Sequence, residues 1–314
     1  MRAYTDEIAV KGKRIKVQGI KADNHEIVVI GRLFKTARIK EEWDEDVEDP
    51  ASLIAKLRSS GVRIDIFTFM QRLPESRPKY DYSMEWDNVA AIPIKDYEYW
   101  FDKQLHPNHR NKVKKANRQG VQVNVVDFDD NLVSSIMGIL NEVPFRQGGP
   151  FLDCGKDFET VKREHATYLE RADFIGAYYK GKLIGYIKLV FAGRFMRTMQ
   201  VLSMMRHRDK APTNALVAEA VKLCCERRIP FLVYGKYSYG KVGSQTLKDF
   251  KDQNGFEHVL LPRYYVPLTP LGRVALACRL HRGIVRGIVP EKLIRFLLSV
   301  RRKWYAGMAG RKLP

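Results

Sequence analysis

Basic side chains recur along one predicted helix at a spacing that suits phosphate binding. Arg110, Lys114 and Arg118 stand four residues apart, and Lys112 and Lys115 flank them. Residues four apart lie on one face of a helix, so the three cations form a stripe. Guanidinium and ammonium groups bind phosphate oxygens through charge-assisted hydrogen bonds. We predict that the stripe binds a phosphate-bearing substrate, because no acid on this helix balances it. The alternative is a solvated helix face.

A second group of polar side chains stands beside two glycines in residues 141–149. Arg146 can hold a carboxylate or phosphate through two guanidinium nitrogens, and Gln147 adds an amide. The Glu142 carboxylate can accept a proton from an attacking amine. We predict that Arg146 and Gln147 bind substrate and that Glu142 is catalytic. An ordinary helix end followed by a turn is the alternative.

The composition indicates a folded protein with an affinity for polyanions. The chain has 314 residues, of which 45% are hydrophobic and 29% are charged, so it can bury a large core. Its formal net charge is +19. Such a charge creates a long-range field that attracts nucleic acid, anionic lipid and nucleotide phosphates. A basic surface without a dedicated partner is the alternative.

Cysteine and histidine spacing gives no sign of a metal site. The four cysteines, Cys154, Cys224, Cys225 and Cys278, form no C-x-x-C pair, so we expect neither zinc nor a disulfide framework. The charged N-terminus has no apolar core typical of a secretory signal, and no run of about 18 apolar residues could span a membrane. We therefore expect a cytoplasmic protein, with contact at the inner face of the membrane as a further option.

Hydrophobic periodicity predicts an α/β protein, with a mixed (α+β) sheet that carries helices on its faces. Pro50, Asp96, Pro107, Asp157 and Pro212 mark helix starts. The predicted strands are 27–34, 62–70, 89–94, 121–126, 174–179, 183–191, 197–205, 231–234 and 256–266. The predicted helices are 51–59, 96–104, 107–119, 129–142, 157–171, one that starts at 212, and 245–253.

The chain divides into three predicted parts: a small α/β lobe over 1–94, a central domain over 95–270 and a tail over 271–314. The tail has eleven lysines and arginines and one acid, so its net charge is 11 − 1 = +10. Its apolar residues recur at helical spacing. Basic amphipathic helices suit an anionic membrane surface. Packing of the tail on the sheet, with its arginines in water, is the alternative.

Three segments resemble the Gcn5-related N-acyltransferase (GNAT) superfamily, and in particular its FemAB-like branch. Residues 109–123 (HRNKVKKANRQGVQV) look like the FemAB basic helix with its glycine stop and following strand. Residues 174–190 (FIGAYYKGKLIGYIKLV) resemble the central hairpin of the superfamily. Residues 234–256 (YGKYSYGKVGSQTLKDFKDQNGF) resemble the FemAB ending with its Phe-Lys pair. The resemblance implies a GNAT-like acyltransferase fold over roughly 95–267, with an incomplete first lobe.

The resemblance also implies where the donor binds. In acetyl-CoA enzymes of this superfamily a glycine loop before the helix holds the pyrophosphate. The equivalent residues 206–215 have no glycine, so side chains would have to hold the phosphate. We predict that these are Arg206, Arg208, Lys210 and Asn214. Because FemAB relatives use aminoacyl-tRNA, the donor is expected to be an acyl-CoA or an aminoacyl-tRNA.

The same resemblance suggests the residues that act on the acyl group. Lys251, from the Phe-Lys pair, would stabilise the negative charge on the attacked carbonyl. Tyr237 would protonate the leaving group, while Lys236 and Tyr239 would contact substrate. His207 follows the central strand and would act as base or phosphate ligand. No metal is expected, and the acceptor would be an amine on a peptide or cell-envelope precursor.

These features predict an N-acyltransferase in which an amine attacks the donor carbonyl directly, with no covalent enzyme intermediate. No G-x-S-x-G elbow argues for a nucleophilic residue. Two alternatives remain. One is an acetyl-CoA-dependent N-acetyltransferase with an unusual pyrophosphate loop. The other is a basic adaptor without catalysis that binds nucleic acid, such as tRNA, or an anionic membrane through 271–314.

Overall fold

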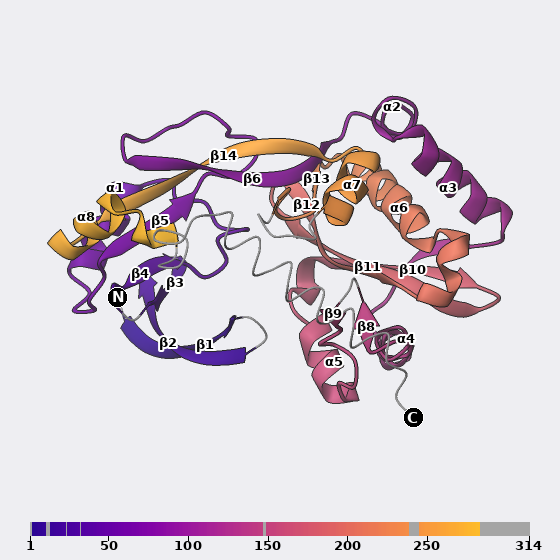
Figure 1. Cartoon of the computed structure of the whole chain (residues 1–314), viewed down its shortest axis with the longest axis horizontal. Helices are drawn as coiled ribbons and strands as arrows, with labels where there is room; N and C mark the ends of the chain where they lie inside the picture. The colour runs from indigo at the N-terminus through magenta and orange to yellow at the C-terminus, as the bar shows by residue number, and fades with distance from the viewer. Residues whose placement is uncertain are drawn as a thin grey trace. The chain divides into compact units, whose positions relative to one another are not determined.

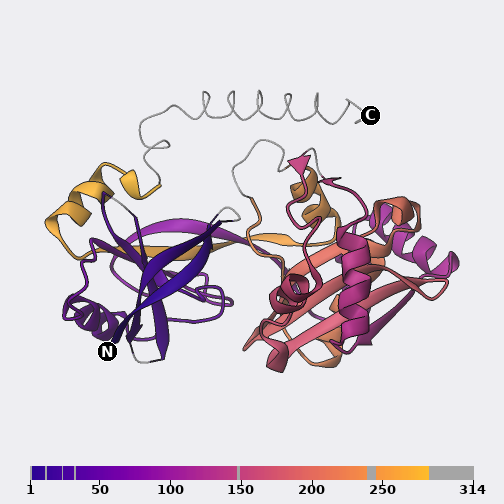
Figure 2. The same cartoon turned by 90° about the horizontal axis from the view of Figure 1, so that it is seen from below.

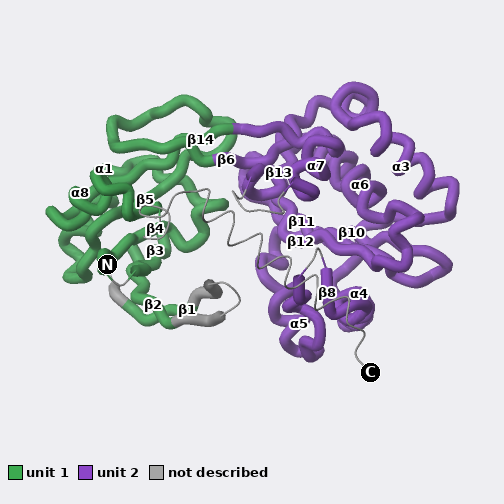
Figure 3. Tube along the Cα trace, viewed as in Figure 1, with its two compact units in different colours: residues 1–87, 260–297 green, residues 88–259, 298–314 purple. Residues whose placement is uncertain are grey.

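The structure is a computed structural model that describes residues 2–10, 13–22, 24–31, 33–146, 149–238 and 245–282. The chain forms two compact units, one of residues 1–87 and 260–297 and the other of residues 88–259 and 298–314 (Figure 3). Two long strands, β6 and β14, run from one unit into the other.

The first unit is built on strands that follow one another in the order β1-β2-β3-β4-β5-β14. Parallel pairing occurs between β4 and β5, and the other neighbours are antiparallel. The strands are β1 (Arg2–Val10), β2 (Lys13–Ala22), β3 (His25–Ile30), β4 (Thr36–Ile39), β5 (Ile66–Met70) and β14 (Glu257–Pro267). Helices α1 (Pro50–Arg58) and α8 (Pro270–Ala277) and a 3-10 turn, η4 (Leu280–Arg282), belong to the same unit.

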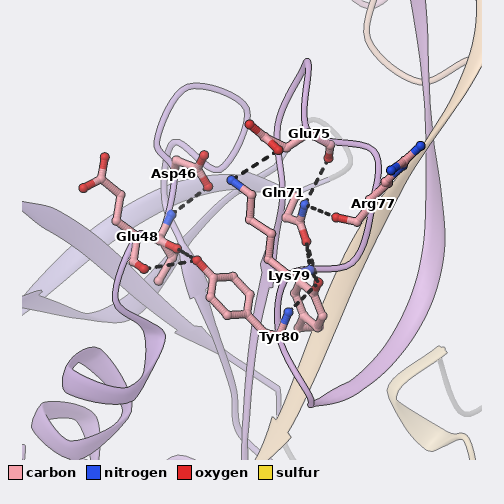
Figure 4. A network of polar contacts seen from close by, with 9 residues as sticks. Asp46, Glu48, Gln71, Glu75, Arg77, Lys79 and Tyr80 are labelled. Atoms are coloured by element: carbon pink, nitrogen blue, oxygen red, sulfur yellow. Dashed lines mark hydrogen bonds and ion pairs between the residues drawn. The ribbon is translucent and has the colours of Figure 1, made fainter.

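Aromatic packing and polar contacts fix the loop that follows β5. Gln71 donates to the carbonyl oxygen of Arg77 at 2.9 Å and accepts from the backbone N–H of Lys79 at 3.0 Å (Figure 4). The Tyr80 hydroxyl donates to the carbonyl oxygens of Val47 and Glu48. Tyr264 on β14 donates to Gln71 at 2.5 Å, so the returning strand completes this network.

The second unit has the strand order β6-β13-β12-β11-β10-β7. Its strands are β6 (Ser83–Pro93), β7 (Gln122–Val126), β10 (Ala172–Tyr179), β11 (Lys182–Ala192), β12 (Phe195–Ser203) and β13 (Phe231–Val233), with the short pair β8 (Phe145–Arg146) and β9 (Gly149–Pro150) apart from them. The predicted mixed sheet is confirmed, since β12 and β13 are parallel and β10, β11 and β12 are antiparallel.

Helices cover both faces of this sheet. In Figure 1, α3 and α6 lie on one side of β10 and β11, and α4 and α5 lie on the other. The helices are α2 (Tyr97–Tyr99) with a π-helical turn η1 (Trp100–Gln104), α3 (Pro107–Arg118), α4 (Asp130–Leu140), α5 (Phe158–His165), α6 (Pro212–Glu226) and α7 (Gln245–Gln253), and the 3-10 turns η2 (Leu169–Arg171) and η3 (Met205–Lys210). Figure 2 gives the same elements in a second view.

Most predicted elements are confirmed. The strand predicted over 62–70 begins only at Ile66, and other elements differ at their ends. The helix predicted over 157–171 ends at His165, because Tyr168 takes a left-handed conformation with φ of 59° and starts a 3-10 turn. The strand predicted over 27–34 ends at Ile30, before Gly31 with φ of 113°. Strands β1 and β2 were not predicted, because charged residues alternate with few apolar ones there. Val17 and Ile20 are nevertheless buried.

The predicted tail begins in a described helix and then leaves the described part of the chain. Residues 270–277 form α8, and the 3-10 turn η4 follows. Residues 283–314 lie outside the described residues. Residues 260–282 join the first unit, because Arg263 to Pro267 of β14 pair with β5.

Candidate functional site

The central feature of the second unit is a place where two parallel strands part. β12 pairs with β13 at only two positions, Met196 with Leu232 and Arg197 with Val233. Beyond Val233 the chain continues along β6, since the Tyr234 N–H donates to Ala90. β12 stays with β11 instead. Within the described residues, the β12 edge from residue 198 onward therefore has no neighbouring strand on the β13 side.

A bulge in β12 lies at the point of separation. Gln200 pairs with Lys188 and Thr198 pairs with Leu189, so Met199 is an extra residue without a partner on β11. A bulge bends its strand and increases the local twist. The extra residue comes two positions after the last β12–β13 pair, whereas β13 pairs with β6 without a shift of register.

Two buried polar atoms lie next to this bulge. The Thr198 hydroxyl and the Gln200 amide oxygen are buried, and neither has a hydrogen-bond partner among the described residues. Buried polar atoms are almost always paired, so each exception calls for an explanation, and a ligand is one. Neither residue was predicted from the sequence. A signal was present, because Arg197, Thr198 and Gln200 interrupt an otherwise apolar strand.

Helix α7 carries the predicted catalytic Lys251 next to this region. The Lys251 side chain is fully buried at 0% exposure. Its ammonium group donates to the carbonyl oxygen of Lys236 and, at 3.3 Å, to that of Tyr237. Burial lowers the pKa of Lys251 to about 8. Lys251 thus fixes the path of the chain just after β13, where it leaves β12.

The predicted Tyr237 lies in the same cluster. Its hydroxyl donates to the Asp252 carboxylate, and its ring stacks on His258 with centroids 4.5 Å apart. Partial burial and the contact with Asp252 raise the pKa of Tyr237 to about 12. The phenol therefore keeps its proton at neutral pH. The structure brings Tyr237, Lys236 and Lys251 together, whereas Tyr239 lies outside the described residues.

Buried hydrogen bonds attach the residue after α7 to η1, and α6 to α3. The Trp100 indole N–H donates to the Asn254 carbonyl oxygen at 3.0 Å. His109 lies 3.0 Å from the Asn214 amide, which the sequence analysis assigned to donor binding. Burial, and to a lesser degree Lys112, lowers the pKa of His109 to about 4, so its ring is neutral. Asn214 is itself buried and contacts this ring.

Glu142, predicted to be catalytic, and Arg146, predicted to bind substrate, hold the segment that follows β12. The Glu142 carboxylate accepts from the backbone N–H groups of Met205 at 2.5 Å and Arg206 at 3.0 Å. Arg146 donates to Glu142 at 3.3 Å and to the Ser203 carbonyl oxygen at 2.9 Å. Both side chains are more than nine-tenths buried. Together they fix η3 at the end of β12, while Gln147 lies outside the described residues.

A basic surface forms where α3 meets η3. Partial burial and the nearby Arg208 both lower the pKa of Lys112, so these two cations lie close together. Lys115 on α3 is near enough to Asp209 to lower the pKa of that carboxyl, after the direct contact of Asp209 with Lys210. The two predicted phosphate sites, on α3 and on η3, are therefore neighbours.

The three cations of the predicted stripe have different environments in the structure. Arg110 donates to the carbonyl oxygens of Asp102 at 3.0 Å and Leu105 at 3.3 Å, and so caps the π-helical turn. Lys114 lies 5.8 Å from the centre of the Phe101 ring. Arg118 is exposed at the end of α3. The face of α3 next to η3 carries Lys112 and Lys115, which were predicted only to flank the stripe.

His207 in η3 has an unusual environment for a surface loop. Its ring lies 5.8 Å from the Tyr179 ring, and its Nδ1 atom is buried without a hydrogen-bond partner among the described residues. Partial burial, Lys210 and Arg206 lower the pKa of His207, so the imidazole is neutral at physiological pH and can accept a proton. Lys210 pairs with Asp209 at 2.8 Å.

In the described part of the chain no three His, Cys, Asp or Glu side chains are grouped as a metal site would require. Likewise, no helix of that part is both long and apolar enough to cross a membrane.

Comparison by sequence gives no relative. No family model matches the chain, and no curated protein matches it.

Solved structures nevertheless share the fold over most of the chain. The C-terminal domain of a predicted lysylphosphatidylglycerol synthetase from Agrobacterium fabrum matches with a TM-score of 0.55 and 14% identity, over 87% of this chain and 91% of that one. FemX matches with a TM-score of 0.51 and 12% identity, over 83% and 88%. L-PGS from Bacillus licheniformis matches with a TM-score of 0.51 and 11% identity, over 81% and 84%. The chain therefore has a GNAT-like fold of the FemAB-like kind.

Proposed function

We propose that this protein is an acyltransferase that moves an aminoacyl group from aminoacyl-tRNA to an amine acceptor. The observation that carries the proposal is the two-position pairing of β12 with β13, which leaves the β12 backbone unpaired beside buried, unpartnered polar atoms. An unpaired strand edge offers N–H groups that can hold a donor carbonyl and stabilise the oxyanion formed on attack.

The chemistry is direct transfer. The acceptor amine attacks the carbonyl carbon, a C–N bond forms, and the ester C–O bond to the tRNA ribose breaks. In this proposal His207, whose imidazole is neutral, accepts the proton that the amine loses. Tyr237, which keeps its proton, is the donor for the departing ribose oxygen.

Lys251 and Glu142 take positioning roles in this proposal. Lys251 binds backbone carbonyl oxygens on the β13 side of the strand separation. Glu142 caps η3 on the β12 side through two backbone N–H groups, so both of its oxygens are occupied. Each thus holds one side of the site at the geometry that attack needs.

The donor is proposed from charge and from the turn before α6. The net charge of +19 suits a long polyanion better than a small thioester. The turn over residues 206–211 contains no glycine. It ends at Ala211, whose backbone has a left-handed conformation. Lys112, Lys115 and Arg208 supply cations for RNA phosphates instead. The name of the Agrobacterium fabrum protein describes the synthesis of a lysyl derivative, which agrees with an aminoacyl donor.

Thermal unfolding with separate donors tests the proposal. A ligand that binds only the folded protein raises the melting temperature. Charged tRNA should raise it, and tRNA with a radiolabelled amino acid should pass its label to an amine-bearing peptide mixture. Stabilisation by acetyl-CoA and not by tRNA would overturn the donor. Equal binding of charged and uncharged tRNA without any transfer would overturn catalysis in favour of an adaptor.

A further inference from the structure

Helix α8, in the first unit, is held firmly on its inner side. Thr269 caps its start by accepting from the Gly272 N–H at 3.1 Å, and the Thr269 hydroxyl donates to buried Asp65 at 2.7 Å. Gly272 and Ala275 are buried. A Cβ atom on Gly272 would lie 1.9 Å from the Asp65 carbonyl oxygen, so the helix backbone is in close contact with the unit beneath it.

The outer side of α8 is apolar and exposed. Leu271 is 42% exposed and Val274 is 56% exposed, and the free thiol of Cys278 is exposed just after the helix. Positions 271, 274 and 278 follow helical spacing and lie on one face. These three residues form what we call the α8 face. No described residue packs over Leu271 or Val274, since both are among the exposed large hydrophobic side chains.

Positive charge surrounds the α8 face. Residues 268–282 contain three arginines and no acid. Arg282 is bound by Glu85 at 2.7 Å, whereas Arg273 and Arg279 are exposed and form no ion pair within the described residues. The sequence from 283 to 314 adds eight lysines and arginines and one acid, a further 8 − 1 = +7.

We propose that the α8 face docks on an anionic lipid surface. A membrane interface accepts apolar side chains below the headgroups while its negative charge attracts the arginines around them. A second copy of the chain, or the segment 283–314, would bring further positive charge against Arg273 and Arg279. Nucleic acid would satisfy the charge and leave Leu271 and Val274 in water. The anionic membrane alone satisfies both features.

Vesicle co-sedimentation of the full chain tests the proposal. The protein should bind vesicles of phosphatidylglycerol and phosphatidylcholine, and should bind much less to phosphatidylcholine alone. Leu271→Ser with Val274→Ser should lower the partition coefficient about tenfold, because two half-exposed apolar side chains lose their burial. Arg273→Gln and Arg279→Gln should each lower it about fivefold, which corresponds to ~1 kcal/mol for each basic residue near an anionic surface.

A matched control separates docking from a general loss of hydrophobicity. Leu169→Ser changes a leucine of the same exposure, 42%, in the second unit, and should leave the partition unchanged. Circular dichroism should show that each variant keeps its fold. Three results would overturn the proposal: equal binding to neutral vesicles, an unchanged partition for the Leu271 and Val274 variant, or a dimer in solution that this variant dissolves. If the parent protein fails to bind vesicles but still binds the donor, the docking proposal is wrong and the proposed acyl transfer stands.

Discussion

At the scale of single residues, the second unit contains buried polar groups whose missing hydrogen bonds lower the stability of the fold. A buried hydroxyl without a partner costs about 1–3 kcal/mol relative to a paired one. The Thr198 hydroxyl is such a group, whereas the Thr213 hydroxyl is paired with Ser203 at 2.8 Å. Sites that retain such a cost are often functional ones, because removing the group would remove its ligand contact.

Thr198→Val therefore should raise the free energy of unfolding by about 1 kcal/mol, because a methyl group replaces an unpaired hydroxyl. Aminoacyl transfer should fall at the same time. Thr213→Val is the matched control and should lower the free energy of unfolding by a similar amount, since it breaks a hydrogen bond. Urea unfolding and a transfer assay give the two readouts. A destabilised Thr198→Val would show that the hydroxyl has a partner within the protein.

Lys188 on β11 is a buried cation that pairs with Gln200 beside the β12 bulge. Its ammonium group donates to the His165 carbonyl oxygen at 2.7 Å and to the Thr167 hydroxyl at 2.9 Å. Burial lowers its pKa from 10.5 to about 8. Between these values the unfolded chain binds more protons than the folded one, so stability rises with pH.

The free energy of unfolding of the parent minus that of Lys188→Met should therefore increase as the pH rises from about 8 to 10.5. The expected slope is on the order of 1 kcal/mol per pH unit near the middle of that range. Below pH 8 both states are protonated and the difference should be constant. Urea unfolding at a series of pH values gives the slope. A constant difference up to pH 10.5 would mean that Lys188 titrates normally in the fold.

At the scale of elements, local signals predicted most helices and the central hairpin. Caps and prolines fixed the helix starts, as at Pro107 of α3 and Asp157 of α5. Strands β1 and β2 were missed although residues 14–17 of β2 alternate between charged and apolar side chains, which is the pattern of a half-buried strand. The bulge at Met199 could not be predicted, since it depends on the register with β11 rather than on the β12 sequence.

Two glycines illustrate how helix packing decides the effect of one methyl group. Gly272→Ala should lower the free energy of unfolding by about 3 kcal/mol, because its Cβ would overlap the Asp65 backbone. Gly138→Ala in α4 meets nothing within 4 Å and should raise it by about 0.5–1 kcal/mol through better helix propensity. Urea unfolding compares the two. Equal effects would mean that α8 can move away from Asp65 at little cost.

At the scale of the whole molecule, the fold could be predicted from the sequence. Which residues far apart in the sequence lie close together in space was harder to predict. Spacing alone placed Arg110, Lys114 and Arg118 together, yet Arg110 binds carbonyl oxygens of its own neighbourhood. The approach of Lys112 to Arg208 depends on how α3 packs beside η3. Tertiary packing of this kind has no periodic signature in a sequence, so only the structure could select Lys112.

The charge of the molecule leads to a final prediction, on donor binding. Affinity for nucleic acid falls with salt because counterions are released at each phosphate that a cation contacts, with a slope of about −0.9 per contact for a duplex. Lys112→Glu with Arg208→Glu should weaken aminoacyl-tRNA binding and make this slope shallower by about two contacts. Lys162→Glu with Arg163→Glu is the control: it makes the same four-unit change of charge on α5, where Lys162 pairs with Asp130 at 2.7 Å. Fluorescence anisotropy with labelled tRNA gives the affinity of the parent, the variant and the control. The salt range is 50 to 200 mM, in which the affinity falls steeply. Equal slopes for the two variants would mean that RNA contacts the basic molecule without using the surface between α3 and η3.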